Sequence, residues 1–283
     1  SQNMSLNSFV TPEGGEIGRA QAMQAQACDI SPHTDMNPIL LKPNSDTGSQ
    51  VIVQGRPVGN MNVQEYDVFK PKVLDTVREC FEHLHQAYEF IVIEGAGSIS
   101  EINLRHADIA NLKVALMARC PVILVADIDR GGVFAQIVGT IELLEPLERD
   151  YIKGIIINKF RGDASILQPG LDFVLERTGI PVLGVLPWMS DLSLPAEDSI
   201  ALTSRSKVVS IIAGHKRIHI GVLKLPRISN FTDFDALQTE PDVSISYVET
   251  SGQINALDVL IIPGSKSTIA DLYFLMERGI YDE

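Results

Sequence analysis

Runs of consecutive apolar, mostly β-branched residues set the pattern of this chain. They occupy residues 90–94 (FIVIE), 121–127 (PVILVAD), 153–158 (KGIIIN) and 181–187 (PVLGVLP). A strand that is buried on both faces reads as a continuous apolar run, whereas a half-buried strand alternates. Because the segments between the runs are long enough for helices, the pattern predicts an α/β fold with a parallel sheet and right-handed crossovers.

Acidic and amide side chains stand where the first three runs end. Glu94 closes the first run and is followed by the small residues 95–97, Asp127 and Asp129 follow the second, and Asn158 closes the third. Ligands of parallel α/β sheets bind beyond the carboxyl ends of the strands. We therefore expect these four polar side chains to share one edge of the sheet.

Other segments carry weaker signals. Apolar residues recur every three or four positions over 63–88, which predicts a long amphipathic helix. Polar, Gly- and Pro-marked segments at 1–18 and 35–48 predict loops. Shorter patterns predict a hairpin over 49–60 and helices over 19–27, 107–118, 133–144 and 165–178.

A second series of predicted strands and helices begins after residue 216. Strands are expected over 218–223, 243–248 and 256–262, with helices over 233–239 and 269–277. This order predicts a first domain over 1–205, a linker over 206–216 and a second domain over 217–283. The chain opens at Ser1 without an initiator methionine, and the second series has few strands, so we expect both domains to be incomplete.

Charge and cysteine content narrow the possible functions. The formal net charge is -13 and the isoelectric point about 4.9, which argues against nonspecific binding of nucleic acid or anionic membranes. No apolar run approaches the roughly 18 residues of a membrane span, and the N-terminus carries no basic-then-apolar leader. Cys28, Cys80 and Cys120 form no CxxC pair, so neither a zinc site nor a disulfide framework is indicated. We expect a globular, cytoplasmic protein.

The loop after the second run, ADIDRGG, has two interpretations. Its glycines let backbone N–H groups approach an anion at the start of the following helix, and Asp127 and Asp129 have the oxygens that Mg²⁺ prefers. Asp129 and Arg130 would then help to place a substrate or its phosphate. Alternatively, the loop is a tight turn in which these two residues form a surface ion pair.

Two further places leave similar choices open. Asn158 and Lys159 end a strand and are able to bind a nucleotide base, but a polar strand cap has the same sequence. Glu16 either begins a surface helix or faces a nucleotide and its metal. The long loop that carries Lys42 and Asp46 is either disordered or functional, and in the second case these two residues would help to place a substrate or its phosphate.

The phosphate-binding element itself is missing from the sequence. No complete P-loop and no GxGxxG motif occurs, and Ser265 stands where a P-loop at 264–268 (GSKST) would need glycine. Taken by itself, the sequence thus indicates a nucleotide-binding fold that lacks the loop that holds the phosphates.

A family resemblance accounts for that gap. The blocks SQNMSLNSFVTPEGGEIGRAQAMQAQA, NPILLKPNSDTGSQVIVQG, VIEGAGSISEINL, ILVADIDRGGVFAQIVGT, IINKFRGD, GVLPW and IIPGSKSTIADL resemble cobyric acid synthase, the glutamine-hydrolysing amidotransferase of the corrinoid pathway. These blocks span nearly the whole chain. In that family a P-loop precedes the first block, and the nucleophilic Cys and catalytic His follow the last.

The resemblance implies a fold and a reaction. The first domain would be a P-loop NTPase-like, dethiobiotin synthetase-like domain, and the second the start of a flavodoxin-like class I glutaminase. The reaction would be ATP- and Mg²⁺-dependent transfer of glutamine-derived ammonia to carboxylates of adenosylcobyrinic acid a,c-diamide, giving adenosylcobyric acid. A homodimer would be the expected assembly. Glu94 would be a Mg²⁺ ligand, Asn158 an adenine contact, and Gly264 part of the glutaminase oxyanion loop.

Two rival functions belong to other classes. The first rival is a non-catalytic remnant, which would bind a corrinoid or a protein partner. The second is a partition-type ATPase of the same superfamily. The missing P-loop and the corrinoid-family blocks count against the ATPase. Without a P-loop or a glutaminase nucleophile, we expect this chain alone to be inactive.

Overall fold

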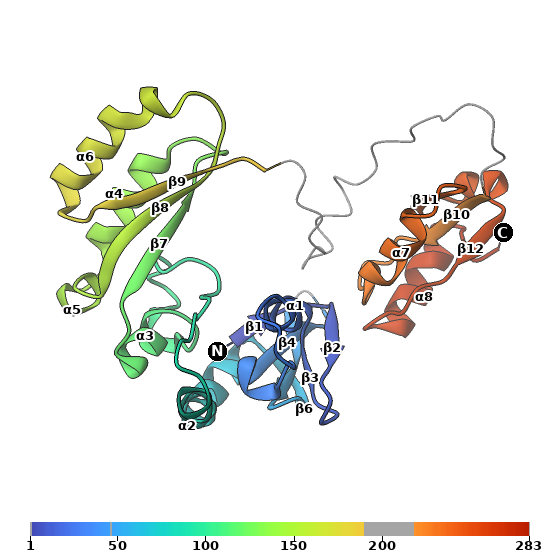
Figure 1. Cartoon of the computed structure of the whole chain (residues 1–283). Coiled ribbons are helices and arrows are strands. Elements are labelled where there is room, and N and C mark those ends of the chain that lie inside the picture. The colour runs from blue at the N-terminus through green and yellow to red at the C-terminus, as the bar shows by residue number, and fades with distance from the viewer. Residues whose placement is uncertain (1, 46, 190–217, 283) are drawn as a thin grey trace. The chain divides into compact units, whose positions relative to one another are not determined.

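The computed structural model describes residues 2–45, 47–189 and 218–282. Asp46 and the predicted linker 206–216 lie outside them. The fold is of the predicted α/β class and divides into two compact units (Figure 1). Among the described residues, one unit contains residues 70–189 and the other contains residues 2–45, 47–69 and 218–282.

A parallel sheet organises the first unit. Its strands are β7 (Val122–Asp127), β8 (Ile152–Phe160) and β9 (Val182–Pro187), in the order β7-β8-β9. The pairings β7·β8 and β8·β9 are both parallel, which confirms the prediction for these three runs. The connections contain α4 (Val133–Leu143), α5 (Pro146–Arg149), the 3₁₀ turn η3 (Ala164–Leu167) and α6 (Gln168–Thr178).

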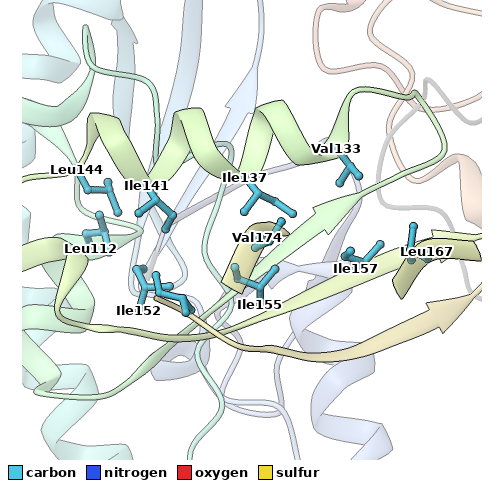
Figure 2. Packing of buried hydrophobic residues seen from close by; sticks show 11 residues of the cluster. Leu112, Val133, Ile137, Ile141, Leu144, Ile152, Ile155, Ile157, Leu167 and Val174 are labelled. Carbon is cyan, nitrogen blue, oxygen red and sulfur yellow. The ribbon is translucent and has the colours of Figure 1, made fainter. Parts of the chain in front are cut away.

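The core of this unit lies between the sheet and two helices. Val133, Ile137 and Ile141 follow one another at four-residue spacing along α4 and pack with Ile155 and Ile157 of β8 (Figure 2). All five side chains are buried. The cluster also contains Leu112, Leu144, Ile152, Leu167, Val174 and Ile180.

Gly170 permits α6 to approach α4 closely. A Cβ atom at this position would lie 2.2 Å from the ring of Phe134. Overpacking of this kind typically costs about 1–3 kcal/mol, so Gly170→Ala is expected to lower the free energy of unfolding in urea by that amount. Gly139→Ala is the matched control, because nothing lies within 4 Å of its Cβ and alanine is favoured by about 0.5–1 kcal/mol in a helix interior. Equal shifts in both variants would contradict the packing described here.

The opposite face of the sheet is open among the described residues. On β7, Ile123 and Val125 are 49% and 59% exposed and alternate with Val122 and Leu124, which pack against the core. On β9, Leu183 is 56% exposed and follows Val182, which packs against the core. The prediction that these runs are buried on both faces is therefore wrong for β7 and β9. Their apolar composition reflects strand preference as well as burial.

The run 90–94 is not a strand, contrary to its pattern. Residues 90–94 have no assigned secondary structure, and Phe90 and Val92 are each 84% exposed. A strand needs a neighbour to satisfy its backbone groups, and in the described sheet β7 pairs with β8 and not with this run. The hydrophobic composition of the run predicted a strand, but composition does not show whether a neighbouring strand is present to pair with it.

The second unit begins with two small sheets. A mixed sheet has the order β1-β4-β5-β6, and β2 pairs with β3 in a hairpin. The loops predicted at 1–18 and 35–48 were therefore wrong in part, because strands of three to five residues give too short a pattern to recognise. The bounds are β1 (Gln2–Met4), β2 (Ser8–Val10), β3 (Glu16–Gly18), β4 (Ile39–Pro43), β5 (Gly48–Val53) and β6 (Arg56–Asn62).

The hairpin predicted over 49–60 is confirmed. β5 and β6 are antiparallel and joined at Gln54 and Gly55, whose φ angles are 45° and 75°. Positive φ at both central residues is typical of the tight turns that connect such strands. The helices α1 (Arg19–Ala27) and α2 (Val63–Ala87) agree with prediction, whereas α3 (Leu112–Ala118) begins five residues later than expected.

A second parallel sheet forms the C-terminal part of this unit. Its order is β11-β10-β12, with β10 (Ile218–Leu223), β11 (Val243–Val248) and β12 (Val259–Ile261). Both pairings are parallel, as predicted. α7 (Asp235–Gln238) and α8 (Thr268–Glu277) follow β10 and β12. Within the described residues, no helix is long and apolar enough to cross a bilayer.

Candidate functional site

The register of β7 and β8 brings two predicted site residues side by side. Asp127 and Asn158 are paired positions in the parallel ladder. Immediately beyond them the backbone N–H of Ile128 donates to the carbonyl of Asn158 at 3.1 Å. Asp127, Asp129 and Asn158 thus lie at one edge of the sheet, as expected from the strand ends.

Two basic residues from β8 and its continuation pair with the acids of this edge. Lys159 Nζ lies 2.6 Å from Asp127 Oδ2, and Arg161 Nε lies 3.0 Å from Asp129 Oδ1. The surface ion pair considered between Asp129 and Arg130 is therefore wrong, since Asp129 bonds Arg161 instead. Residue 159 adopts a left-handed conformation, with φ of 63°, which an L side chain rarely does.

These contacts set the charge state of Asp127. The hydrogen bond from Lys159 and the one from the backbone N–H of Asp129, 2.9 Å away, lower the pKa of the Asp127 carboxyl. The charge of Arg130 acts in the same direction. Asp127 is consequently an anion at neutral pH.

The side chain of Asn158 has a local bond. Its Oδ1 accepts from the backbone N–H of Lys159 at 2.8 Å, which is the geometry of a polar strand cap. The role of this amide in binding a nucleotide stays a prediction.

Sequence reasoning missed the part of this edge made by Arg161 and Trp188. The Arg161 guanidinium lies 3.6 Å from the centre of the Trp188 ring, within the range of a cation–π contact. The backbone N–H of Trp188 donates to the carbonyl of Phe160 at 2.8 Å. The sequence signal that could have indicated this contact is that Arg161 and Trp188 directly follow two neighbouring strands, β8 and β9.

The glycines after Asp129 leave backbone exposed at the start of α4. Gly131 and Gly132 have φ angles of 78° and 72°, and no atom lies within 4 Å of a Cβ built on either. Gly132 is the N-cap of α4 and has no side-chain cap. The loop therefore leaves space beside its backbone, and its role in binding an anion stays a prediction.

Glu94 stands in a loop that is fastened to α3. The side chain of Asn111 accepts from the Ala96 N–H at 3.0 Å and donates to the Ala96 carbonyl at 2.8 Å. A Cβ on Gly95 would lie 2.3 Å from Asn111 Oδ1, so only glycine fits beside this pair of bonds. The side chain of Asn111 thus helps to hold the loop that presents Glu94. The position of Glu94 relative to Asp127 stays a prediction.

Gly95→Ala tests this fastening. The added methyl group is expected to displace Asn111 and to release the N–H of Ala96. Loss of one hydrogen bond, worth about 1.4 kcal/mol, would speed amide exchange there about 10-fold. Hydrogen exchange read by NMR measures it, with Asn111→Ala expected to give the same local change. Unaltered exchange at Ala96 in both variants would contradict the role of Asn111.

A second polar cluster lies in the other unit. Lys42 on β4 is buried and contacts Glu16 on β3 and the hydroxyl of Ser8, 3.1 Å away. Burial raises the pKa of Glu16, but the hydrogen bonds from Lys42 and Ser8 outweigh it, so the pKa is lowered overall. The structure places Glu16 and Lys42 together, although they were predicted for different roles. Asp46 lies outside the described residues.

The loop at Gly264 packs against residues 227–229. Ser229 donates its N–H to the Gly264 carbonyl at 2.9 Å, and a Cβ on Gly264 would meet Ser229 Oγ at 2.9 Å. Ser265 forms a bridge with Ile228 and bonds the buried Asp271 of α8. The backbone of this loop is therefore well fixed. Its role in an oxyanion hole stays a prediction.

No group of three or more His, Cys, Asp or Glu residues forms a metal cluster within the described residues, and none of the three cysteines forms a disulfide. Mg²⁺ usually takes only one or two protein carboxylates and completes its shell with phosphate oxygens and water. The ionised Asp127, with Glu94 as the second predicted ligand, fits that donor set. A pocket of about 230 Å³ beside Lys224, Glu249 and Arg278 contains none of the predicted site residues.

Comparison with known protein families finds a match for two parts of the chain. Residues 63–196 match an AAA domain, and residues 219–283 match the CobB/CobQ-like glutamine amidotransferase domain. No solved structure matches the chain.

Curated relatives match over nearly the whole chain. A cobyric acid synthase of Carboxydothermus hydrogenoformans is 52% identical over 99% of the chain, which covers 56% of that relative. A probable cobyric acid synthase of Methanothermobacter thermautotrophicus is 54% identical over 100% of the chain, and the match covers 55% of that relative. The chain therefore spans about half the length of these relatives.

Proposed function

We propose that this chain, which belongs by sequence to the cobyric acid synthase family, carries part of an ATP- and glutamine-dependent amidation of corrinoid carboxylates. The proposed substrate is adenosylcobyrinic acid a,c-diamide and the product is adenosylcobyric acid. The observation that supports this most is the identity of 50–54% with cobyric acid synthases over at least 99% of the chain. The edge formed by Asp127, Asp129 and Asn158 agrees with a nucleotide site at strand ends.

The reaction needs an activated carboxyl group. A corrinoid carboxylate oxygen attacks the γ-phosphorus of ATP, and ADP leaves. Ammonia from glutamine then attacks the acyl carbon, phosphate leaves with the former carboxylate oxygen, and the nitrogen loses a proton. When bound, Mg²⁺ neutralises charge on the phosphates during the first step.

The residues of the edge have separate roles in this proposal. Asp127 and Glu94 hold the metal, and Asn158 and Lys159 bind the nucleotide. Lys159 also neutralises Asp127 while no cation is bound, through their 2.6 Å contact. Asp129 and Arg130 place the substrate or its phosphate, and Arg161 holds Asp129 through their 3.0 Å contact. Lys42 and Asp46 are proposed for the same placement task.

The second part of the chain contributes to ammonia release. Backbone N–H groups of the loop at Gly264 stabilise the oxyanion formed when glutamine is attacked. The bond from Ser229 to the Gly264 carbonyl holds the peptide in a fixed orientation. None of Cys28, Cys80 and Cys120 follows this loop, so the nucleophile is not assigned to this chain.

Calorimetry on a chimera tests the proposal against its rivals. The chimera replaces the matching segment of the Carboxydothermus relative, 282 aligned residues, with this chain. Titration with Mg-ATP and with the corrinoid diamide is expected to give saturable binding of both. Corrinoid binding without nucleotide binding would instead support a binding remnant, and nucleotide binding without corrinoid binding would support a partition-type ATPase.

A further inference from the structure

Two loop segments of the C-terminal part pair with one another. The backbone N–H of Ser229 donates to the Gly264 carbonyl, and the backbone N–H of Lys266 donates to the Arg227 carbonyl, both at 2.9 Å. We call these four residues, with those between them on each segment, the paired loops. They contain the backbone that is proposed for the oxyanion hole.

Both segments also contact the N-terminal part of the same compact unit. Lys266 donates from its Nζ to the side-chain oxygen of Gln50 on β5. On the other segment, Asn230 accepts the backbone N–H of Ser8 on its Oδ1 atom at 3.0 Å. These bonds join residues that are 216 and 222 positions apart. The N-terminal strands therefore hold the paired loops by one side chain from each segment.

The ammonium group of Lys266 stands in a costly position. Burial lowers the pKa of this amine and the charge of Lys42 lowers it further, whereas the charge of Glu16 raises it. Gln50 is paired with Lys42 across the β4–β5 ladder, so the acceptor of Lys266 lies on the same face of the sheet as Lys42. The bond to Gln50 and the attraction of Glu16 offset the cost of burial and repulsion.

We propose that Lys266 is a positioning residue of the glutaminase loop, which it joins to the N-terminal sheet through Gln50 and Glu16. A charge-assisted hydrogen bond at the end of the side chain restrains the backbone that carries it. Since a misplacement of about 1 Å is able to cost about 100-fold in rate, this restraint sets how well the backbone N–H groups stabilise the oxyanion. The inference deepens the proposed function and rests on it for one point, the role of the loop at Gly264.

The same contact makes ammonia release depend on the N-terminal part of the protein. Glu16 lies on β3 and contacts Lys42, which is proposed to place the substrate. Ammonia that is formed away from an acceptor escapes into solvent. A glutaminase loop that is ordered only against the N-terminal sheet confines glutamine hydrolysis to the state in which both parts are together.

Hydrogen exchange in the 283-residue chain, read by NMR, tests the docking. Gln50→Leu removes the acceptor of Lys266 without changing a residue of the paired loops. Exchange of the Ser229 amide is expected to become at least about 10-fold faster, the loss of one charge-assisted hydrogen bond. Gln64→Leu, the same change at an exposed position of α2, is the matched control and should exchange like the parent. Gln50→Glu keeps an acceptor oxygen and should also match the parent.

Glutamine hydrolysis by the chimera tests the effect on the loop. Lys266→Met is expected to lower kcat for glutamate release at least about 10-fold with little change in KM, because the oxyanion forms only after glutamine has bound. Lys224→Met is the matched control, because Lys224 pairs with Glu249 at 2.7 Å in the same unit. Gln50→Leu should lose activity as Lys266→Met does, and the double variant should lose no more than either one.

The inference is overturned if the Ser229 amide exchanges at the parental rate in a folded Gln50→Leu variant. It is also overturned if the losses of Gln50→Leu and Lys266→Met add up in the double variant, which would show two independent effects. A chimera that hydrolyses no glutamine would contradict the proposed function, and the exchange result alone then decides the docking. The two failures are therefore told apart.

Discussion

Replacing Lys42 with methionine is expected to lower the free energy of unfolding by about 2–3 kcal/mol, because the change leaves the Glu16 carboxylate partly buried without its main partner. Removal of one partner of a fully buried pair costs about 3–5 kcal/mol. The smaller figure applies here since Glu16 keeps some solvent contact and still interacts with Lys266. Urea unfolding measures the loss.

A double-mutant cycle separates the ion pair from the packing of the lysine stem. Glu16→Gln in the Lys42→Met background should restore much of the lost stability, because no buried charge is then left uncompensated. Lys224→Met is again the control, since Glu249 is half exposed and such pairs contribute about 0–1 kcal/mol. Additive losses in the two single variants would show that Lys42 and Glu16 do not stabilise one another.

The same pair predicts a dependence on pH. The folded pKa of Glu16 lies below its ordinary value of 4.5, so the unfolded chain binds a proton more readily than the folded one. The stability that Glu16 supplies is therefore complete above pH 4.5 and is lost as the pH falls through its folded pKa. The difference in free energy of unfolding between the parent and Glu16→Gln, measured in urea at a series of pH values, should shrink in that acid range.

The second large effect is expected from Glu94→Gln in the chimera. A glutamine keeps the shape of the side chain but removes the charge that a metal ligand supplies, and we expect Mg²⁺-dependent nucleotide binding to weaken at least about 100-fold. Glu101→Gln is the matched control, because Glu101 is an exposed acid of the same segment. Calorimetry with Mg-ATP measures both. Binding that is unchanged in Glu94→Gln would remove Glu94 from the site.

The sequence predicted elements best where a pattern was long. The apolar runs of β7, β8 and β10 and the three- to four-residue spacing of α2 each identified an element to within a few residues. The run 90–94 is also mostly apolar and β-branched and ends in an acid, as β7 does, yet it is not a strand. The difference is the hydrogen-bonding neighbour, which depends on the rest of the sheet and not on the residues of the run.

The candidate site was predictable only in the polar residues that end its strands. Asp127 and Asn158 stand at strand ends, and parallel pairing of the two strands places them side by side. The pairing of Asp129 with Arg161 depends on a left-handed residue 159 and the turn beyond it, for which the sequence has no signal. The contact of Lys266 with Gln50 joins residues 216 positions apart, which no local pattern reveals.

Amidation by the chimera tests the central claim most directly. The chimera is incubated with adenosylcobyrinic acid a,c-diamide, Mg-ATP and glutamine, and the corrinoid products are identified by mass spectrometry. We predict conversion of carboxylates to carboxamides that requires ATP and is weakened at least about 100-fold by Glu94→Gln. A folded chimera that binds the corrinoid but forms no amide, while the parent relative does so under the same conditions, would contradict the proposed function.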